Sequence, residues 1–116
     1  MPISITSPNT TSSQLLELVF GDDYYNADNR AIAFELTGFP VMTGATVIFC
    51  VDKSGTVLTF PCTVVDTDTI RMELTAAQIA TIGVGYWRYD LQATLSNTHV
   101  VTIVKSGLLS ITADIR

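Results

Sequence analysis

Residues 45–52 read Ala-Thr-Val-Ile-Phe-Cys-Val-Asp, and their alternating pattern is the strongest indication of the fold class. Every second side chain, from Ala45 through Phe49 to Val51, is apolar, and the side chains between them include threonine and aspartate. Residues 86–93, Tyr-Trp-Arg-Tyr-Asp-Leu-Gln-Ala, repeat the alternation. Successive side chains of a β-strand point to opposite faces of a sheet, so a period of two predicts a strand in both places.

Weaker alternating patterns extend outward from these two strands, at residues 15–20, 32–36, 70–74, 101–103 and 109–115. Turn-forming residues separate the patterns at residues 21–23, 37–40, 53–55, 66–68, 96–97 and 106–107. Valine, isoleucine and threonine make up 38 of the 116 residues, and their branched side chains favour strands. Residues 75–80 break the pattern, because Thr75 is a suitable N-cap for a short helix that ends before Gly83. We predict an all-β, antiparallel β-sandwich of seven or eight strands with one short helical turn.

The length of 116 residues suits one domain with a real core. Residues 1–14 are mostly serine, threonine, proline and other polar types, and we predict a flexible polar arm there, with the sandwich domain at 15–116. The arm is either a frayed terminus or a segment that becomes ordered only against a neighbouring subunit.

Charge and hydropathy exclude two classes of partner. The formal net charge of -5 repels nucleic acid, and no apolar stretch approaches the about 20 residues of a membrane helix. The chain contains only two lysines, Lys53 and Lys105, and exposed sheet edges commonly carry lysine to prevent pairing with neighbours. We therefore expect some edges to be covered, as in a subunit of an assembly.

No residue pattern predicts catalysis. The only histidine, His99, follows a turn and is expected to be an exposed hairpin residue. Cys50 and Cys62 lack the second pair that a structural zinc site needs, and they form either one disulfide or two buried thiols. We predict no catalytic residues, no cofactor and no metal.

Acidic and aromatic residues in loops leave other interpretations open. Asp22, Asp23 and Asp28 share one loop, and a second loop holds Asp66 and Asp68. Aspartate is a preferred turn residue, and carboxylates on loops are also the ligands of calcium.

Aromatic side chains and one further carboxylate complete the candidates. Tyr24 and Tyr25 stand beside Asp22 and Asp23, and these four residues are the candidate partner contacts. Trp87 is expected to lie in the core between the sheets, and Asp90 is expected on the solvated face that it shares with Arg88.

The order of these segments resembles a known family. The matching stretches are residues 21–23, 36–38, 43–49, 72–78, 85–92 and 101–107. The most specific are Leu74-Thr75-Ala76-Ala77-Gln78 and, after it, Gly85-Tyr86-Trp87-Arg88-Tyr89-Asp90-Leu91-Gln92. Together they resemble the immunoglobulin-like domain of tailed-phage virion proteins, and most closely the N-terminal domain of BppU-type upper baseplate proteins. The resemblance covers about residues 15 to 116.

The resemblance implies an immunoglobulin-like β-sandwich without catalytic activity that acts through oligomeric contacts in the virion. Proteins of that family continue into fibre-like or receptor-binding regions, whereas this chain ends at Arg116, after its last predicted strand. We therefore expect a capsid cement (decoration) protein that binds the major capsid protein through symmetric contacts, assembled in the host cytoplasm.

Two alternatives remain. The first is a baseplate or tail adaptor, with tail or baseplate proteins as its partners, and the second is a receptor- or glycan-binding module. A homo-oligomer is expected, and a trimer by analogy with shell decorations at threefold points.

Overall fold

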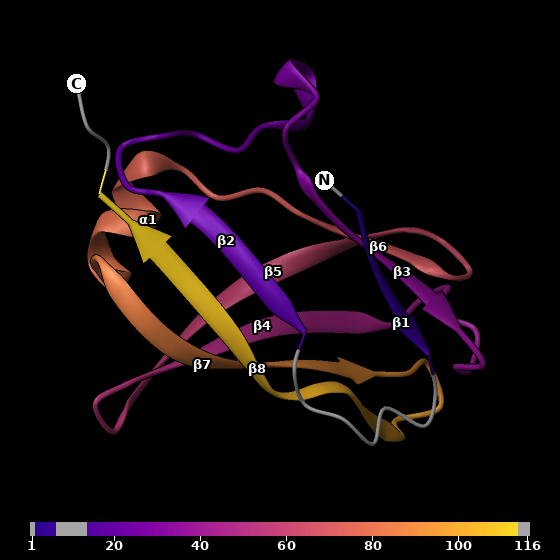
Figure 1. Cartoon of the computed structure of the whole chain (residues 1–116). Helices are drawn as coiled ribbons and strands as arrows, with labels where there is room; N and C mark the ends of the chain where they lie inside the picture. The colour runs from indigo at the N-terminus through magenta and orange to yellow at the C-terminus, as the bar shows by residue number, and fades with distance from the viewer. Residues whose placement is uncertain (1, 7–13, 114–116) are drawn as a thin grey trace.

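The computed structural model describes residues 2–6 and 14–113. The strands are β1 (Pro2–Thr6), β2 (Leu15–Val19), β3 (Ile32–Thr37), β4 (Thr46–Lys53), β5 (Thr56–Asp66), β6 (Thr69–Met72), β7 (Gly85–Thr94) and β8 (Val100–Thr112) (Figure 1). A 3-10 helix, η1, covers Asn26–Asp28, and the α-helix α1 covers Ala76–Ile82. The all-β class is confirmed.

The strands form one eight-stranded mixed sheet in the order β1-β3-β6-β5-β4-β7-β8-β2. The inner pairs are antiparallel, but β1 runs parallel to β3 and β2 runs parallel to β8. The prediction of a wholly antiparallel arrangement is therefore wrong at both edges. The reason is the N-terminal segment, which supplies both edge strands and reaches its neighbours in the sheet through long connections, as parallel pairing requires.

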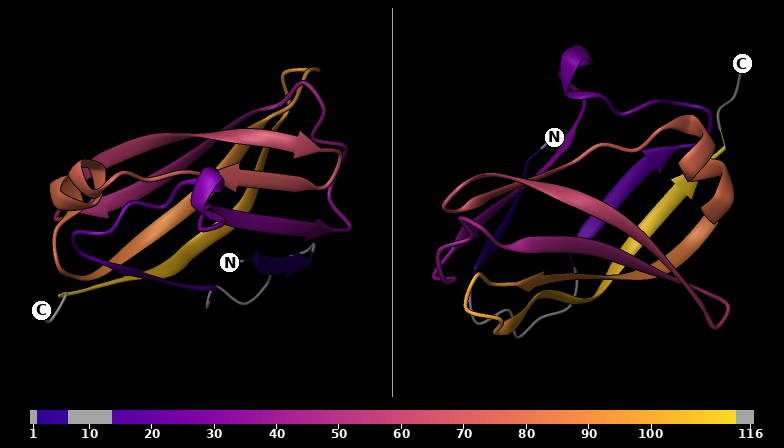
Figure 2. Two further views of the ribbon diagram at one scale, coloured as in Figure 1. Left: turned by 90° about the horizontal axis from the view of Figure 1, so that it is seen from above. Right: turned by 180° about the vertical axis from the view of Figure 1, so that it is seen from behind.

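β5 joins the two halves of the sheet. Residues 56–62 pair with β4, and residues 63–66 pair with β6. The sheet curves along this strand, so that β3 and β6 face β7 and β8 across the core (Figure 2). β5 was not predicted from the sequence, because most of its residues are exposed, Val57 and Val65 among them, and its apolar residues do not keep to one face.

The core lies on the concave side of the curved sheet, and every strand contributes at least one buried apolar side chain to it. Phe49 on β4 stacks on Tyr89 on β7 with ring centroids 4.8 Å apart, and Phe60 on β5 approaches Phe49 at 6.5 Å. The alternation in β4 and β7 is confirmed, since Phe49, Val51 and Tyr89 are all buried. Trp87 is half-buried against this core and donates a hydrogen bond from Nε1 to the Gly83 carbonyl oxygen at 2.9 Å.

The N-terminal arm differs from its prediction. Residues 2–6 form β1, and Ile5 is fully buried in the core, so this part of the arm is a structural strand. The physical reason is a short period of two, which directs Ile3 and Ile5 inward between polar neighbours. Residues 7–13 of the arm lie outside the described residues, whereas Gln14 is held by hydrogen bonds to its carbonyl oxygen from Leu108 N (3.1 Å) and Tyr89 Oη (3.0 Å).

β8 is one strand where two were predicted. The turn expected at residues 106–107 is instead a bulge, with register shifts opposite Tyr89–Gln92 and a left-handed φ of 56° at Ser106. Asp90 on β7 accepts a hydrogen bond from Ser106 N at 2.7 Å, which satisfies the backbone group that the bulge frees. Gly107 is buried beside the ring of Tyr89. A serine-glycine pair therefore bends this strand without ending it.

The predicted helical turn is confirmed as α1, which begins after the N-cap Thr75. Gln78 N donates to Thr75 Oγ1 at 3.1 Å, and Thr75 N donates to Gln78 Oε1 at 2.9 Å, a reciprocal capping box. Asp23 Oδ1 accepts from Ala76 N at 2.6 Å, so the loop before η1 is tied to the first turn of the helix.

Candidate functional site

Tyr24, one of the four predicted contact residues, belongs to the core. Its side chain is only 3% exposed, and its hydroxyl oxygen accepts a hydrogen bond from Val19 N at 2.7 Å. The Arg30 guanidinium covers its ring, 4.6 Å from the ring centroid. Tyr24 therefore cannot offer its ring to a partner, because the ring is buried and covered by Arg30. The sequence did not predict this burial, because a loop has no regular alternation of buried and exposed residues. Tyr25 points outward, 40% exposed.

The predicted acidic contacts take part in contacts within the chain. Asp22 Oδ2 lies 3.2 Å from Arg30 Nη2, and Asp23 Oδ1 caps α1. Asp28 lies in η1. Within residues 2–6 and 14–113, no three histidine, cysteine, aspartate or glutamate side chains lie close enough together to hold a metal ion. These aspartates shape the loop and fix it against α1.

The second acidic loop, residues 66–68, is a turn, as predicted. Asp68 N donates to Asp66 Oδ1 at 3.0 Å, and this hydrogen bond lowers the pKa of Asp66. A hydrogen bond with the Asp66 side chain raises the pKa of Asp68. His99 is exposed in the turn between β7 and β8, and its backbone N donates to Asn97 Oδ1 at 3.0 Å, which confirms the hairpin interpretation.

The two cysteines are free thiols on opposite faces of the sheet. Cys50 pairs with Thr59 on the outer face, whereas Cys62 pairs with Val47 and points inward. Burial, and then the charge of Asp90, raises the pKa of the Cys50 thiol. Burial, and then Cys50, raises the pKa of Cys62 to about 12. Both thiols are protonated at neutral pH, so neither is an activated nucleophile.

We expect the free energy of unfolding to fall as the pH rises from about 9 to about 12. The pKa of Cys62 rises from 9.0 to about 12 in the folded chain. In that window the unfolded chain releases the thiol proton and the folded chain keeps it, so higher pH favours unfolding. Urea denaturation at several pH values should show a smaller fall for Cys62→Ala.

Tyr89, whose pKa is also raised by burial, adds a further loss above pH 10 in both proteins. The comparison between wild type and Cys62→Ala therefore isolates the thiol. Identical pH dependence in the two proteins would contradict the assignment.

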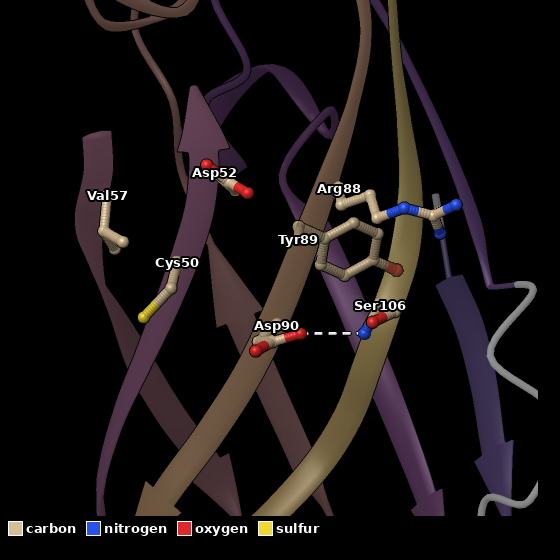
Figure 3. Close-up of a pocket in the computed structure, with 7 residues that line it drawn as sticks. All are labelled: Cys50, Asp52, Val57, Arg88, Tyr89, Asp90 and Ser106. Carbon is tan, nitrogen blue, oxygen red and sulfur yellow. Dashed lines mark hydrogen bonds between the residues drawn. The ribbon is translucent and has the colours of Figure 1, made fainter. Parts of the chain in front are cut away.

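One pocket lies on the outer face of the sheet, with a volume of about 170 Å³. Its lining residues are Cys50, Asp52, Val57, Arg88, Tyr89, Asp90 and Ser106 (Figure 3). Asp90 does share this face with Arg88, as predicted, but it is half-buried and held by Ser106 N rather than freely solvated. Asp52 Oδ1 likewise accepts from Gly55 N at 3.0 Å. The carboxylates stabilise turns and a bulge, and the pocket offers polar contacts rather than a nucleophile.

A group of exposed side chains beside the β2 edge was not predicted from the sequence. Leu15 is opposite Leu108, and Leu108 is opposite Arg88, so these three side chains lie in one row across β2, β8 and β7. In the neighbouring row the exposed side chains are Glu17 and Tyr86, and Ser110, which pairs with both, is buried between them. The register between strands distant in sequence brings them together, and no motif signals that register.

Comparison with protein-family models and with curated proteins finds no match for this chain. In the part of the chain that the structure describes, no helix is long and apolar enough to cross a membrane. The fold and the surface are therefore what bear on function.

Proposed function

We propose that this chain is a non-enzymatic structural protein of a tailed-phage virion, a capsid cement protein with an immunoglobulin-like fold. The observation that carries the proposal is the strand order. In immunoglobulin domains one sheet has the order A-B-E-D and the other contains C, F and G. The orders β1-β3-β6-β5 and β4-β7-β8 follow the same scheme in the same chain sequence.

The centre of the core supports the same proposal. Antibody-type immunoglobulin domains place a buried tryptophan of strand C against the disulfide that joins strands B and F. Here Phe49 on β4 stacks on Tyr89 on β7 at the corresponding place. The chain departs from the scheme in the parallel pairing of β1 with β3 and in the extra edge strand β2, which runs parallel to β8. It departs also at β5, which bonds to both β4 and β6, and in its free cysteines.

The exposed row beside β2 supports a role in assembly. Leu15 is 47% exposed and its cross-strand neighbour Leu108 is 37% exposed, on a chain with few charged residues. Neighbouring apolar side chains at a surface mark a protein contact. The partners we propose are the major capsid protein and other copies of this chain, or tail and baseplate proteins if the chain is an adaptor.

A receptor- or glycan-binding module has less support. It would use Tyr24 and Tyr25 with the aspartates of the same loop, but Tyr24 is buried and Asp23 caps α1. A melting temperature that rises with added calcium, or binding on a glycan array, would favour this module over the cement protein.

The test is the copy number of this chain in purified virions, measured by quantitative mass spectrometry against the major capsid protein. About one copy per capsid subunit is the result expected for a cement protein. A few copies per hundred capsid subunits would favour the tail or baseplate adaptor. Absence from the particle would overturn both.

A further inference from the structure

The outer face of β7, β8 and β2 carries a compact patch with opposite charges at two corners. We call it the β2-edge patch, and its exposed members are Leu15, Glu17, Tyr86, Arg88 and Leu108; Ser110, between Glu17 and Tyr86, is buried. The first row across the strands consists of Arg88, Leu108 and Leu15, and the second row consists of Tyr86, Ser110 and Glu17. Arg88 and Glu17 therefore occupy diagonally opposite corners, and Tyr86 and Leu15 occupy the other two.

Neither charge of this patch has an ion-pair partner in residues 2–6 and 14–113. Among the described residues, Arg88 and Glu17 form no ion pair, and both side chains are exposed. The Arg88 side chain extends from β7 across β8 rather than towards Asp52, which faces it from β4 (Figure 3). Leu108 is 37% exposed between them. The patch thus combines exposed apolar side chains with one accessible charge of each sign.

We propose that the β2-edge patch binds the same patch of a second copy of this chain, face to face. A two-fold axis in the plane of the sheet, along the diagonal from Tyr86 to Leu15, exchanges the two charged corners. It places each Arg88 against Glu17 of the second copy. Leu15 and Tyr86, which lie near the axis, meet their own counterparts. The proposed dimer rests on the proposed function only in that a cement protein and a dimer both require contacts between copies of this chain.

Charge complementarity favours a second copy over another partner. A partner must present an acidic and a basic group at opposite corners of an apolar surface, and this chain presents that arrangement itself. Self-complementarity of this kind is what a two-fold interface requires. Pairing through the β2 edge is less favourable, because an antiparallel β2–β2 ladder centred on Glu17 sets two glutamates opposite each other.

A charge-reversal cycle tests the proposal on the purified chain. Sedimentation equilibrium gives the dimer Kd for wild type, Glu17→Arg, Arg88→Glu and the double variant. Each single reversal creates two like-charge contacts per dimer and should raise the Kd by about tenfold or more. The double variant restores opposite charges and should return the Kd to near the wild-type value. Glu35→Arg, on the exposed face of β3, is the matched control and should leave the Kd unchanged.

Melting temperatures of each variant separate loss of folding from loss of association. The dimer Kd of Leu108→Ser gives an independent measurement. This substitution weakens the apolar contact without changing the charge of the patch, so the Kd should rise. A monomer at all concentrations, an oligomer indifferent to the charge reversals, or a trimer that survives them would overturn the proposal. The copy number in virions is measured separately, so a failed dimer and a failed virion role are distinguishable.

Discussion

Gly107→Ala will destabilise the protein by about 3 kcal/mol, because the added methyl group has no space. A Cβ atom at residue 107 would lie 2.5 Å from Tyr89 Cε2, 2.6 Å from Tyr89 Cζ and 3.0 Å from Val104 Cγ1. The Tyr89 ring cannot retreat easily, since it stacks on Phe49 and its hydroxyl donates a hydrogen bond to the Gln14 carbonyl oxygen. Urea denaturation at neutral pH measures the loss.

The background of Tyr89→Leu provides the control for this clash. Leucine lacks the two ring atoms that the new methyl group would meet, so Gly107→Ala should cost under about 1 kcal/mol there. An equal cost in both backgrounds would mean that the backbone conformation at residue 107, and not the Tyr89 ring, requires glycine.

Phe49→Ala should cost about 4 kcal/mol, the typical result of removing a buried aromatic side chain and leaving a cavity. Phe49 is fully buried, and its ring contacts Tyr89 and Phe60 from the two neighbouring strands. Removing this side chain therefore weakens the packing between β5, β4 and β7. Thermal and urea denaturation should both show the change.

Val57→Ala is the matched control, because Val57 lies on the outer face of β5, next to β4, and is 62% exposed. An exposed substitution of this kind should change the free energy of unfolding by under about 0.5 kcal/mol. A cost for Phe49→Ala as small as that of Val57→Ala would place residue 49 outside the core.

Prediction from sequence succeeded for elements that a pattern of neighbouring residues is enough to identify. The alternation of residues 45–52 and 86–93 identified β4 and β7, and the Thr75 cap with Gly83 identified α1. It failed for β5, which is paired on both sides but exposes most of its side chains. It also failed at residues 106–107, because a serine-glycine pair is equally compatible with a turn and with a bulge.

Prediction of the candidate site was weaker, for a related reason. Tyr24 and Tyr25 are adjacent and chemically identical in the sequence, yet the first is buried under Arg30 and the second is exposed. Asp22 and Asp23 were correctly placed in a loop, but their partners, Arg30 and Ala76, are set by the folded chain. A contact surface depends on which side chains remain exposed after packing.

The order of residues in the chain is enough to establish that this protein is all-β, where most of its strands lie and that one helical turn interrupts them. Those properties follow from local periodicity and capping, which depend only on residues close together in the sequence. The parallel pairing of both edge strands and the grouping of Leu15, Arg88 and Leu108 on one surface arise only when the whole chain folds. These depend on register between strands far apart in sequence, which is selected by burial of the whole core.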